Sequence, residues 1–157
     1  MKLFLCQLLF MGAVLVAITG CDENRVFEEY KSIPESTWNK DSLVRFDVHI
    51  DNTSQNNNLY IDVRNELTYS YSNLWLFVEI VQPNGKAVKD TVEITLALPS
   101  GEWLGKGFGG LKTYQALFRR NVYFPEAGDY KINIQQGMRE ENLKGISDIG
   151  FRVEKVD

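Results

Sequence analysis

The chain has few of the residues on which catalysis or cross-linking would depend. Its 157 residues include two cysteines, Cys6 and Cys21, and one histidine, His49. A catalytic triad or a zinc site would have to be built around that histidine, and no Gly-x-Ser-x-Gly sequence is present. The net charge of −4 argues against nucleic acid as a partner and against a basic attachment to anionic lipid. We therefore expect no enzyme activity and no cofactor.

Long apolar runs are also lacking, apart from residues 3–18, which follow Lys2. This run is short for a membrane span, and its layout of charge, apolar core and small residues is typical of a secretory signal. The sequence Ile18-Thr-Gly-Cys21 ends it, and a cysteine at this point is typical of a bacterial lipoprotein signal. We expect Cys21 to carry a diacylglyceryl group on its thiol and an acyl chain on its amine. An ordinary secretory leader, or a short anchor helix, is the alternative.

Such a lipid anchor has consequences for the mature chain. Each buried methylene contributes about 0.8 kcal/mol, so two or three acyl chains hold a protein on a membrane essentially permanently. Cys6 leaves with the signal and Cys21 is acylated, which leaves no thiol pair for a disulfide. We divide the chain into a signal peptide at residues 1–20, a tether at 21–40 and a folded domain at 41–157. Within the tether, Phe27, Tyr30 and Trp38 are expected to lie partly against the domain.

From Leu43 onward, apolar residues alternate with polar ones, and turn residues separate the alternating segments. This pattern predicts seven or eight β-strands and an all-β, antiparallel sandwich of the jelly-roll or immunoglobulin-like type. The run at 72–82 is apolar on both faces, so it predicts a central strand with Trp75 in the core. Residues 138–143 could form a single helical turn. The predicted strands cover residues 43–50, 59–63, 72–82, 88–98, 114–124, 130–135 and 149–153.

Three local patterns suggest a binding or catalytic site, but none has the full set of features that such a site needs. Residues 105–110 formally match a dinucleotide-binding fingerprint, yet no amphipathic helix follows, so a surface loop is favoured. Asp47, Asp51 and Asn52 offer oxygens to a calcium ion without the spacing of a calcium loop. His49 is expected to be an exposed strand residue.

Aromatic residues are the remaining signal for binding. Trp103 and Phe108 flank the glycine-rich loop, and Tyr71 precedes the central strand. Exposed rings there would suit a protein partner or the face of a sugar. The alternative is that Trp103 and Phe108 fold back as a lid on the sandwich. We name these three residues as candidate partner-binding residues.

Nine segments, in order, resemble the GldH family of gliding-motility lipoproteins from Bacteroidota. They are Cys21-Asp-Glu-Asn-Arg-Val-Phe-Glu-Glu-Tyr-Lys31, Trp38-Asn-Lys-Asp-Ser-Leu-Val-Arg-Phe46, Asn58-Leu-Tyr-Ile-Asp-Val-Arg-Asn65, Tyr71-Ser-Asn-Leu-Trp-Leu-Phe-Val78, Pro83-Asn-Gly85, Trp103-Leu-Gly-Lys-Gly-Phe108, Phe124-Pro-Glu126, Ile134-Gln-Gln-Gly-Met-Arg139 and Gly145-Ile-Ser-Asp-Ile-Gly-Phe-Arg-Val-Glu-Lys155. The resemblance implies a noncatalytic envelope component associated with gliding and type IX secretion, in which only Cys21 has a defined role.

Two functions therefore compete. The first is a lipid-anchored protein, on the outer membrane of the cell envelope, that binds other gliding or secretion proteins. The alternative is a glycan-binding surface lipoprotein that stacks Trp103 and Tyr71 on sugar rings. A hydrolase ranks third, because an acid and a base would have to come together from separate strands.

Overall fold

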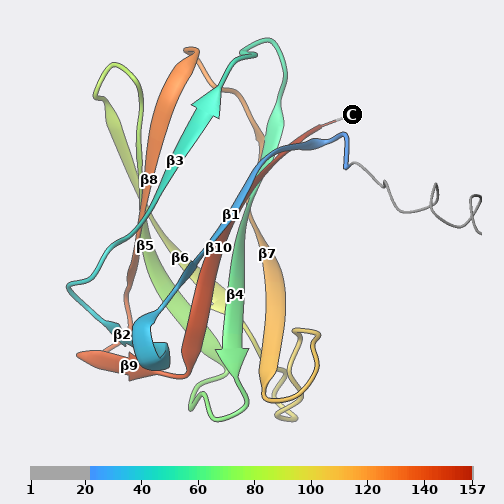
Figure 1. Cartoon of the computed structure of the whole chain (residues 1–157), viewed down its shortest axis with the longest axis vertical. Helices are drawn as coiled ribbons and strands as arrows, with labels where there is room; N and C mark the ends of the chain where they lie inside the picture. The colour runs from blue at the N-terminus through green and yellow to red at the C-terminus, as the bar shows by residue number, and fades with distance from the viewer. Residues whose placement is uncertain (1–21, 157) are drawn as a thin grey trace, which may run out of the picture.

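A computed structural model describes residues 22–156, which form two packed β-sheets and a short third one (Figure 1). The predicted signal peptide and Cys21 lie outside the described residues. Sheet A has the order β1-β10-β4-β7, sheet B the order β2-β9, and sheet C the order β3-β8-β5-β6. The strands are β1 (Arg25–Ser32), β2 (Thr37–Asn39), β3 (Val44–Ile50), β4 (Asn57–Glu66), β5 (Asn73–Val81), β6 (Ala87–Thr95), β7 (Leu111–Val122), β8 (Gly128–Gln136), β9 (Asn142–Lys144) and β10 (Ile146–Lys155).

The topology is that of a jelly roll. All strand pairs are antiparallel, and without the short β2 and β9 the chain supplies four long strands to each of two facing sheets. In chain order, sheet A receives the first, third, sixth and eighth of these strands, and sheet C receives the other four. This arrangement confirms the predicted antiparallel sandwich and selects the jelly roll over the immunoglobulin-like alternative.

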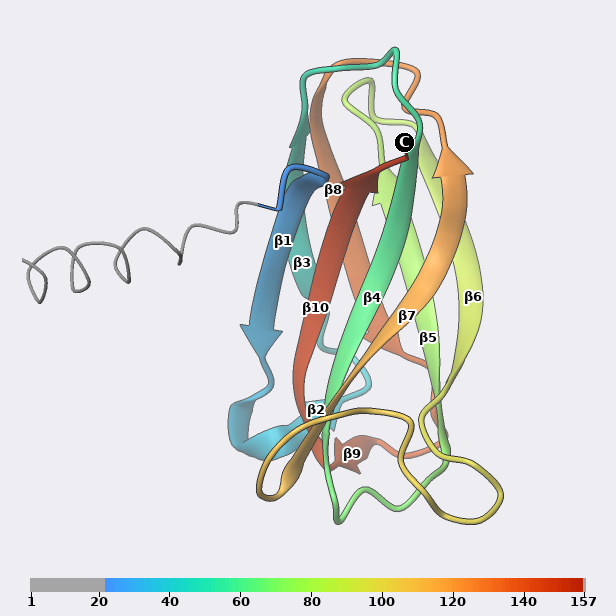
Figure 2. The ribbon, with the colours of Figure 1, turned by 90° about the vertical axis from the view of Figure 1, so that its right-hand side faces the viewer.

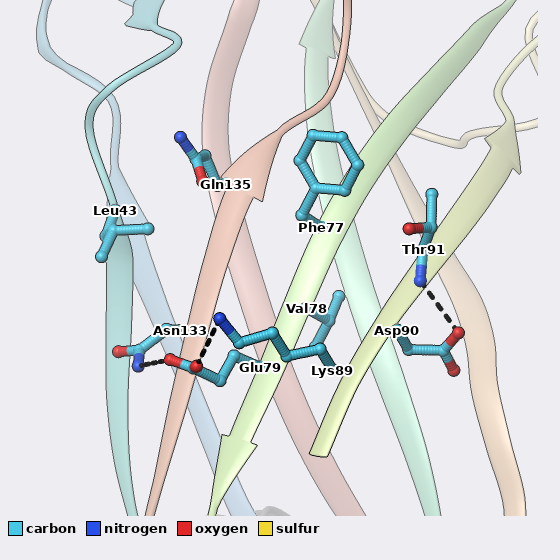
Figure 3. Close-up of a pocket in the computed structure, with 9 residues that line it drawn as sticks. All are labelled: Leu43, Phe77, Val78, Glu79, Lys89, Asp90, Thr91, Asn133 and Gln135. Carbon is cyan, nitrogen blue, oxygen red and sulfur yellow. Dashed lines mark hydrogen bonds and ion pairs between the residues drawn. The ribbon is translucent and has the colours of Figure 1, made fainter. Parts of the chain in front are cut away.

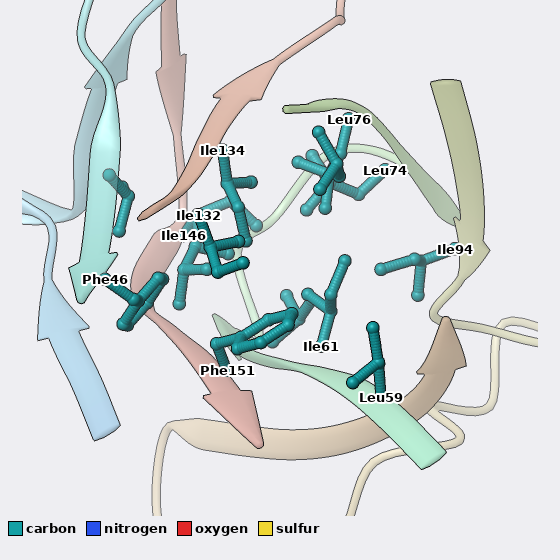
Figure 4. Close-up of a cluster of buried hydrophobic side chains, with 14 of the residues drawn as sticks. Phe46, Leu59, Ile61, Leu74, Leu76, Ile94, Ile132, Ile134, Ile146 and Phe151 are labelled. Carbon is teal, nitrogen blue, oxygen red and sulfur yellow. The ribbon is translucent and has the colours of Figure 1, made fainter. Parts of the chain in front are cut away.

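Alternation of apolar residues explains why the two sheets adhere. In β3, every second residue from Val44 to Ile50 is buried and the residues between them are exposed. The same period places one face of the long strands other than β1 in a single apolar layer between the sheets (Figure 4). Phe46 of sheet C meets Phe151 of sheet A across this layer, with ring centroids 6.0 Å apart.

The segment predicted as a tether belongs to the sandwich instead. Residues 25–32 form β1, which pairs with β10 along the edge of sheet A. After the 3₁₀ turn η2 (Pro34–Ser36), Trp38 of β2 is 1% exposed and donates from Nε1 to the Ser42 carbonyl at 3.0 Å. The tether interpretation was wrong because an edge strand held by backbone hydrogen bonds needs no regular apolar alternation.

Two further predictions were wrong. Trp75 is 39% exposed, because only one face of β5 enters the core. Residues 138–141 bend into β9, which pairs with β2, and the segment 138–143 contains no helical turn. No helix in the described chain has the length and apolar character needed to cross a bilayer.

The outer face of sheet A contains a buried carboxyl group. Tyr30, Gly150, Asp62 and Gln115 lie opposite one another in a row across β1, β10, β4 and β7. A Cβ atom on Gly150 would lie 2.8 Å from Cε1 of Tyr30, so the glycine leaves room for that ring beside Asp62. Asp62 is 0% exposed, and within residues 22–156 neither of its carboxylate oxygens has a hydrogen-bond partner. Burial raises the pKa of Asp62, and burial beside that carboxyl raises the pKa of Tyr30 to about 12.

Replacing Gly150 with alanine should therefore weaken the attachment of β1. The new methyl group would collide with the Tyr30 ring, and overpacking of this kind costs about 1–3 kcal/mol of unfolding free energy. Urea denaturation of Gly150→Ala against Gly110→Ala measures the effect, since a Cβ on Gly110 would meet nothing within 4 Å. Equal midpoints for the two variants would contradict the packing role of Gly150.

Asp62 should make stability depend on pH in a direction unusual for a carboxyl group. Its pKa is raised in the folded state, so its contribution is fully present below the ordinary unfolded value of about 3.9 and is lost as pH rises through the folded pKa. Asp62→Asn should consequently be more stable than wild type by about 1–3 kcal/mol at pH 7. The gain should shrink as the pH is lowered.

Denaturation from pH 3 to pH 8 tests this expectation, with Asp47→Asn on the exposed face of β3 as the control. A constant difference between Asp62→Asn and wild type across this range would show that Asp62 does not titrate differently in the folded and unfolded states.

Candidate interaction surface

Aromatic side chains are exposed on the outer face of sheet C. Trp75 and Phe77 occupy alternate positions of β5 and are 39% and 48% exposed. The Phe77 ring packs over Gly137, where a Cβ atom would lie only 3.2 Å from Cε2 of the ring. Met138 packs beside the strand, and its Sδ accepts a hydrogen bond from the Trp75 backbone N–H at 3.3 Å. Sheet C therefore presents apolar surface on both of its faces.

Leu43 extends this surface toward β3. Leu43, which directly precedes β3, and Phe77 line an open depression of about 730 Å³ over β8, β5 and β6, and Figure 3 shows the residues that line it. Tyr71, Trp75 and Met138 line a second depression of about 400 Å³ where β5 begins. We call the five residues Leu43, Tyr71, Trp75, Phe77 and Met138 the β5 patch.

The polar groups beside the β5 patch bond to one another. Glu79 lies 3.2 Å from Lys89 Nζ and accepts a hydrogen bond from Asn133 Nδ2 at 2.9 Å (Figure 3). The hydrogen bond from Asn133, followed by the one from Lys89, lowers the pKa of Glu79. Gln135 Nε2 donates to a backbone carbonyl, that of Lys40. The apolar surface therefore has a rim of polar side chains, each of which already has at least one partner within the chain.

The three aromatic residues named from the sequence lie at one end of the sandwich but not in one cluster. Tyr69, which is buried, links two of them: its ring centroid lies 5.7 Å from that of Tyr71 and 6.5 Å from that of Trp103. The Tyr71 hydroxyl donates to Glu140 at 2.7 Å, which raises the pKa of Tyr71. Trp103 is half-buried against the core, whereas Phe108 is fully exposed at the loop tip. Tyr71 alone of the three belongs to the β5 patch.

Sequence reasoning missed Trp75 and Phe77 as surface residues. Both lie in a run with apolar residues on both faces, so the run was assigned to a strand covered on both sides. The polar residues Asn73 and Glu79 lie on the same face of β5 as Trp75 and Phe77, because residues two apart along a strand point to the same side. These polar residues were the signal that could have identified an exposed face.

The glycine-rich loop has a structural role. Leu111 begins β7 directly after it, so a strand stands where a dinucleotide site would need a helix. Lys106 and Thr113 exchange backbone hydrogen bonds of 2.9 and 2.8 Å. A Cβ on Gly107 would come within 2.5 Å of the Leu111 carbonyl oxygen, so this close pairing requires glycine.

His49 lies on the exposed face of β3, as predicted, between two carboxylates. Its Nδ1 is 2.5 Å from Asp129 and its Nε2 is 3.1 Å from Asp51. The hydrogen bond with Asp129 raises the pKa of His49. Asn52, another calcium candidate, accepts hydrogen bonds from Ser54. Within residues 22–156, no group of three or more histidine, cysteine or acidic side chains has the geometry to hold a metal ion.

The likeness to a solved structure of another protein is weak. A carbohydrate-binding module specific for non-crystalline cellulose aligns with 83% of this chain and 73% of its own, at 12% identity and a TM-score of 0.43. This likeness is too low to indicate a shared ligand.

Sequence relatives are much closer. A protein of Christiangramia forsetii described as a gliding motility lipoprotein GldH homolog is 44% identical over 150 residues, covering 91% of both chains. The gliding motility lipoprotein GldH of Flavobacterium johnsoniae is 38% identical over 157 residues, covering 96% of both. The profile of the GldH lipoprotein family matches residues 25–153, which include every strand of the sandwich except the last two residues of β10. The chain therefore belongs to the GldH lipoprotein family.

Proposed function

We propose that this protein is a noncatalytic, lipid-anchored component of the outer membrane that serves gliding motility and the associated type IX secretion by binding other envelope proteins. Its family membership and the names of its two relatives support the motility role. The sequence Ile18-Thr-Gly-Cys21 supports the lipid anchor.

The β5 patch is the observation that supports protein binding. Aromatic residues and methionine are enriched where proteins meet, and the residues that carry most of the binding energy are apolar anchors inside a polar rim. Trp75 and Phe77 are such anchors, and Glu79, Lys89, Asn133 and Gln135 form the rim. A partner that covered these rings would remove apolar area from water without breaking the hydrogen bonds of the rim.

The same rim favours a protein over a glycan. Sugar recognition needs side chains that offer free donors and acceptors to many hydroxyl groups, in addition to an aromatic platform. Around Phe77, the amide N–H groups of Asn133 and Gln135 already donate within the chain. Near Trp75, Asn73 Nδ2 donates to Glu93 at 2.6 Å. The patch is therefore better suited to apolar contact.

The double variant Trp75→Ala, Phe77→Ala should lose its partner while remaining folded. Truncation of one such anchor costs about 2 kcal/mol, which is roughly a 30-fold loss of affinity. Affinity capture from native membranes in mild detergent, with mass spectrometry of the recovered proteins, measures the loss. The matched control is Leu117→Ala, because Leu117 is 41% exposed on β7, in the other sheet.

We expect gliding or secretion envelope proteins to be recovered with wild type and with Leu117→Ala, but not with the double variant. Equal recovery with the double variant would contradict a role for the β5 patch. Saturable quenching of tryptophan fluorescence by oligosaccharides, lost in Trp75→Ala, would instead support the glycan-binding alternative.

Cys21→Ser should release the protein from the membrane, because a serine hydroxyl is not a substrate for thioether formation with the diacylglyceryl group. Membrane fractionation measures the release, and the intact mass of the wild-type protein measures the attached lipid. A wild-type mature protein with an unmodified Cys21 thiol would rule out the anchor. The sandwich itself should be unaffected, since its first strand, β1, begins only at Arg25.

A further inference from the structure

The first described residue is already fastened to the sandwich. The Asp22 carboxylate pairs with the Arg152 guanidinium of β10, which lowers the pKa of Asp22. The Asp22 carbonyl accepts a hydrogen bond from Arg25 N–H at 3.3 Å, and the Asn24 carbonyl accepts one from Lys155 N–H at 2.8 Å. Arg152 also lies 3.0 Å from Glu28 of β1, and its side chain is only 11% exposed. No free linker separates residue 22 from the folded domain within the described chain.

These contacts identify one end of the jelly roll, which we call the anchor end. The loop 51–56 belongs to it, because Asn56 accepts a hydrogen bond from Val156 N–H at 2.9 Å. The last residue of β7, Val122, also lies at this end, because it pairs with Asn57 at the start of β4. The turns at 83–86 and 123–127 meet there, since Asn84 Nδ2 donates to Glu126 at 2.6 Å. Figure 2 shows the start of β1 and the end of β10 beside these loops.

We propose that the anchor end rests on the headgroups of the lipid bilayer, so that the sandwich stands on the membrane with its strands pointing away from it. The proposal rests on the acylation of Cys21 proposed above. Cys21 is joined to Asp22 by one peptide bond, and consecutive Cα atoms are about 3.8 Å apart. Acyl chains on Cys21 must lie in the hydrocarbon, which holds Asp22 at the level of the headgroups.

The surface chemistry of the anchor end suits this contact. Its longest loop begins with the exposed Asp51 and continues with Asn52-Thr-Ser-Gln-Asn56, whose uncharged polar side chains can hydrogen-bond to lipid headgroups. Tyr123, also at this end, is 60% exposed, and tyrosine is enriched at the boundary between membrane and water. The acyl chains supply the affinity, and these residues decide which surface faces the lipid.

The opposite end then lies far from the membrane. A strand rises about 3.3 Å per residue, so the 10 residues of β10 place the far loops roughly 30 Å above the headgroups. Leu67, Leu98 and Phe108, which are 49%, 41% and 101% exposed, lie in those loops. The start of β5, with Trp75, lies at that end as well, because Leu96 N–H donates to the Ser72 carbonyl there. The apolar side chains that are candidates for partner binding are thus held away from the lipid.

Single-cysteine probes test this orientation on the full-length, lipidated protein in vesicles of phosphatidylethanolamine and phosphatidylglycerol. Ser54→Cys places a fluorophore at the anchor end, and Ser100→Cys places one in a loop of the far end; both serines are exposed. Asp47→Cys places a fluorophore midway along β3, so it would be quenched most strongly if the molecule lay with the outer face of sheet C on the membrane. Quenching by a nitroxide on the lipid headgroups should be several-fold stronger for the probe at position 54 than for the probes at 47 and 100.

The control inserts a 15-residue Gly/Ser linker between Cys21 and Asp22. Such a linker spans about 20 Å, so it should abolish most of the difference between the probes at positions 54 and 100. Vesicle flotation with equal quenching at positions 54 and 100, or with the strongest quenching at position 47, would overturn the standing orientation alone. Failure of the protein to float with the vesicles would remove the lipid anchor and overturn both proposals.

Discussion

The pairing of β1 with β10 is the interaction on which the rest of the arrangement depends. It adds the fourth strand to sheet A and places Tyr30 over Gly150 beside the buried Asp62. It also brings the acidic residues at the start of the described chain to Arg152. Because β1 begins four residues after the expected lipid cysteine, this one strand pair determines both the completeness of the sandwich and the place where a membrane anchor would attach.

The sequence predicted the strands that have one buried and one polar face. In β3 and β8, alternation of Val, Ile and Phe with charged or amide residues marks both the strand and its buried side. The order of the strands was not predictable, because alternation shows which face of a strand is buried but not which strand lies beside it. β1 was missed for a related reason: its backbone pairs with β10, while its side chains carry little of the period that reveals a strand.

The candidate surface was predictable only in part. The sequence indicates that Tyr71, Trp103 and Phe108 flank loops, but it does not show which ring returns to the core. Trp103 returns because Tyr69 and the core offer it apolar contacts, whereas Phe108 stands on a loop whose backbone is held by the pairing of Lys106 with Thr113. Trp75 and Phe77 were assigned to the core because an exposed aromatic ring and a buried one look alike in sequence.

A short anchor would lower the entropy cost of binding a partner at a surface far from the membrane. A lipoprotein on a long flexible linker samples many heights and orientations, so a partner must restrict that motion when it binds, at a cost in entropy. Here Asp22 is already fixed by Arg152, and no free linker lies between residue 22 and the sandwich in the part of the chain that the structure describes. On a sandwich standing at the membrane, the β5 patch would keep a constant height and direction. A partner embedded in the same membrane would then meet Trp75 and Phe77 in one geometry, and their apolar contact would not be weakened by the ordering of a tether.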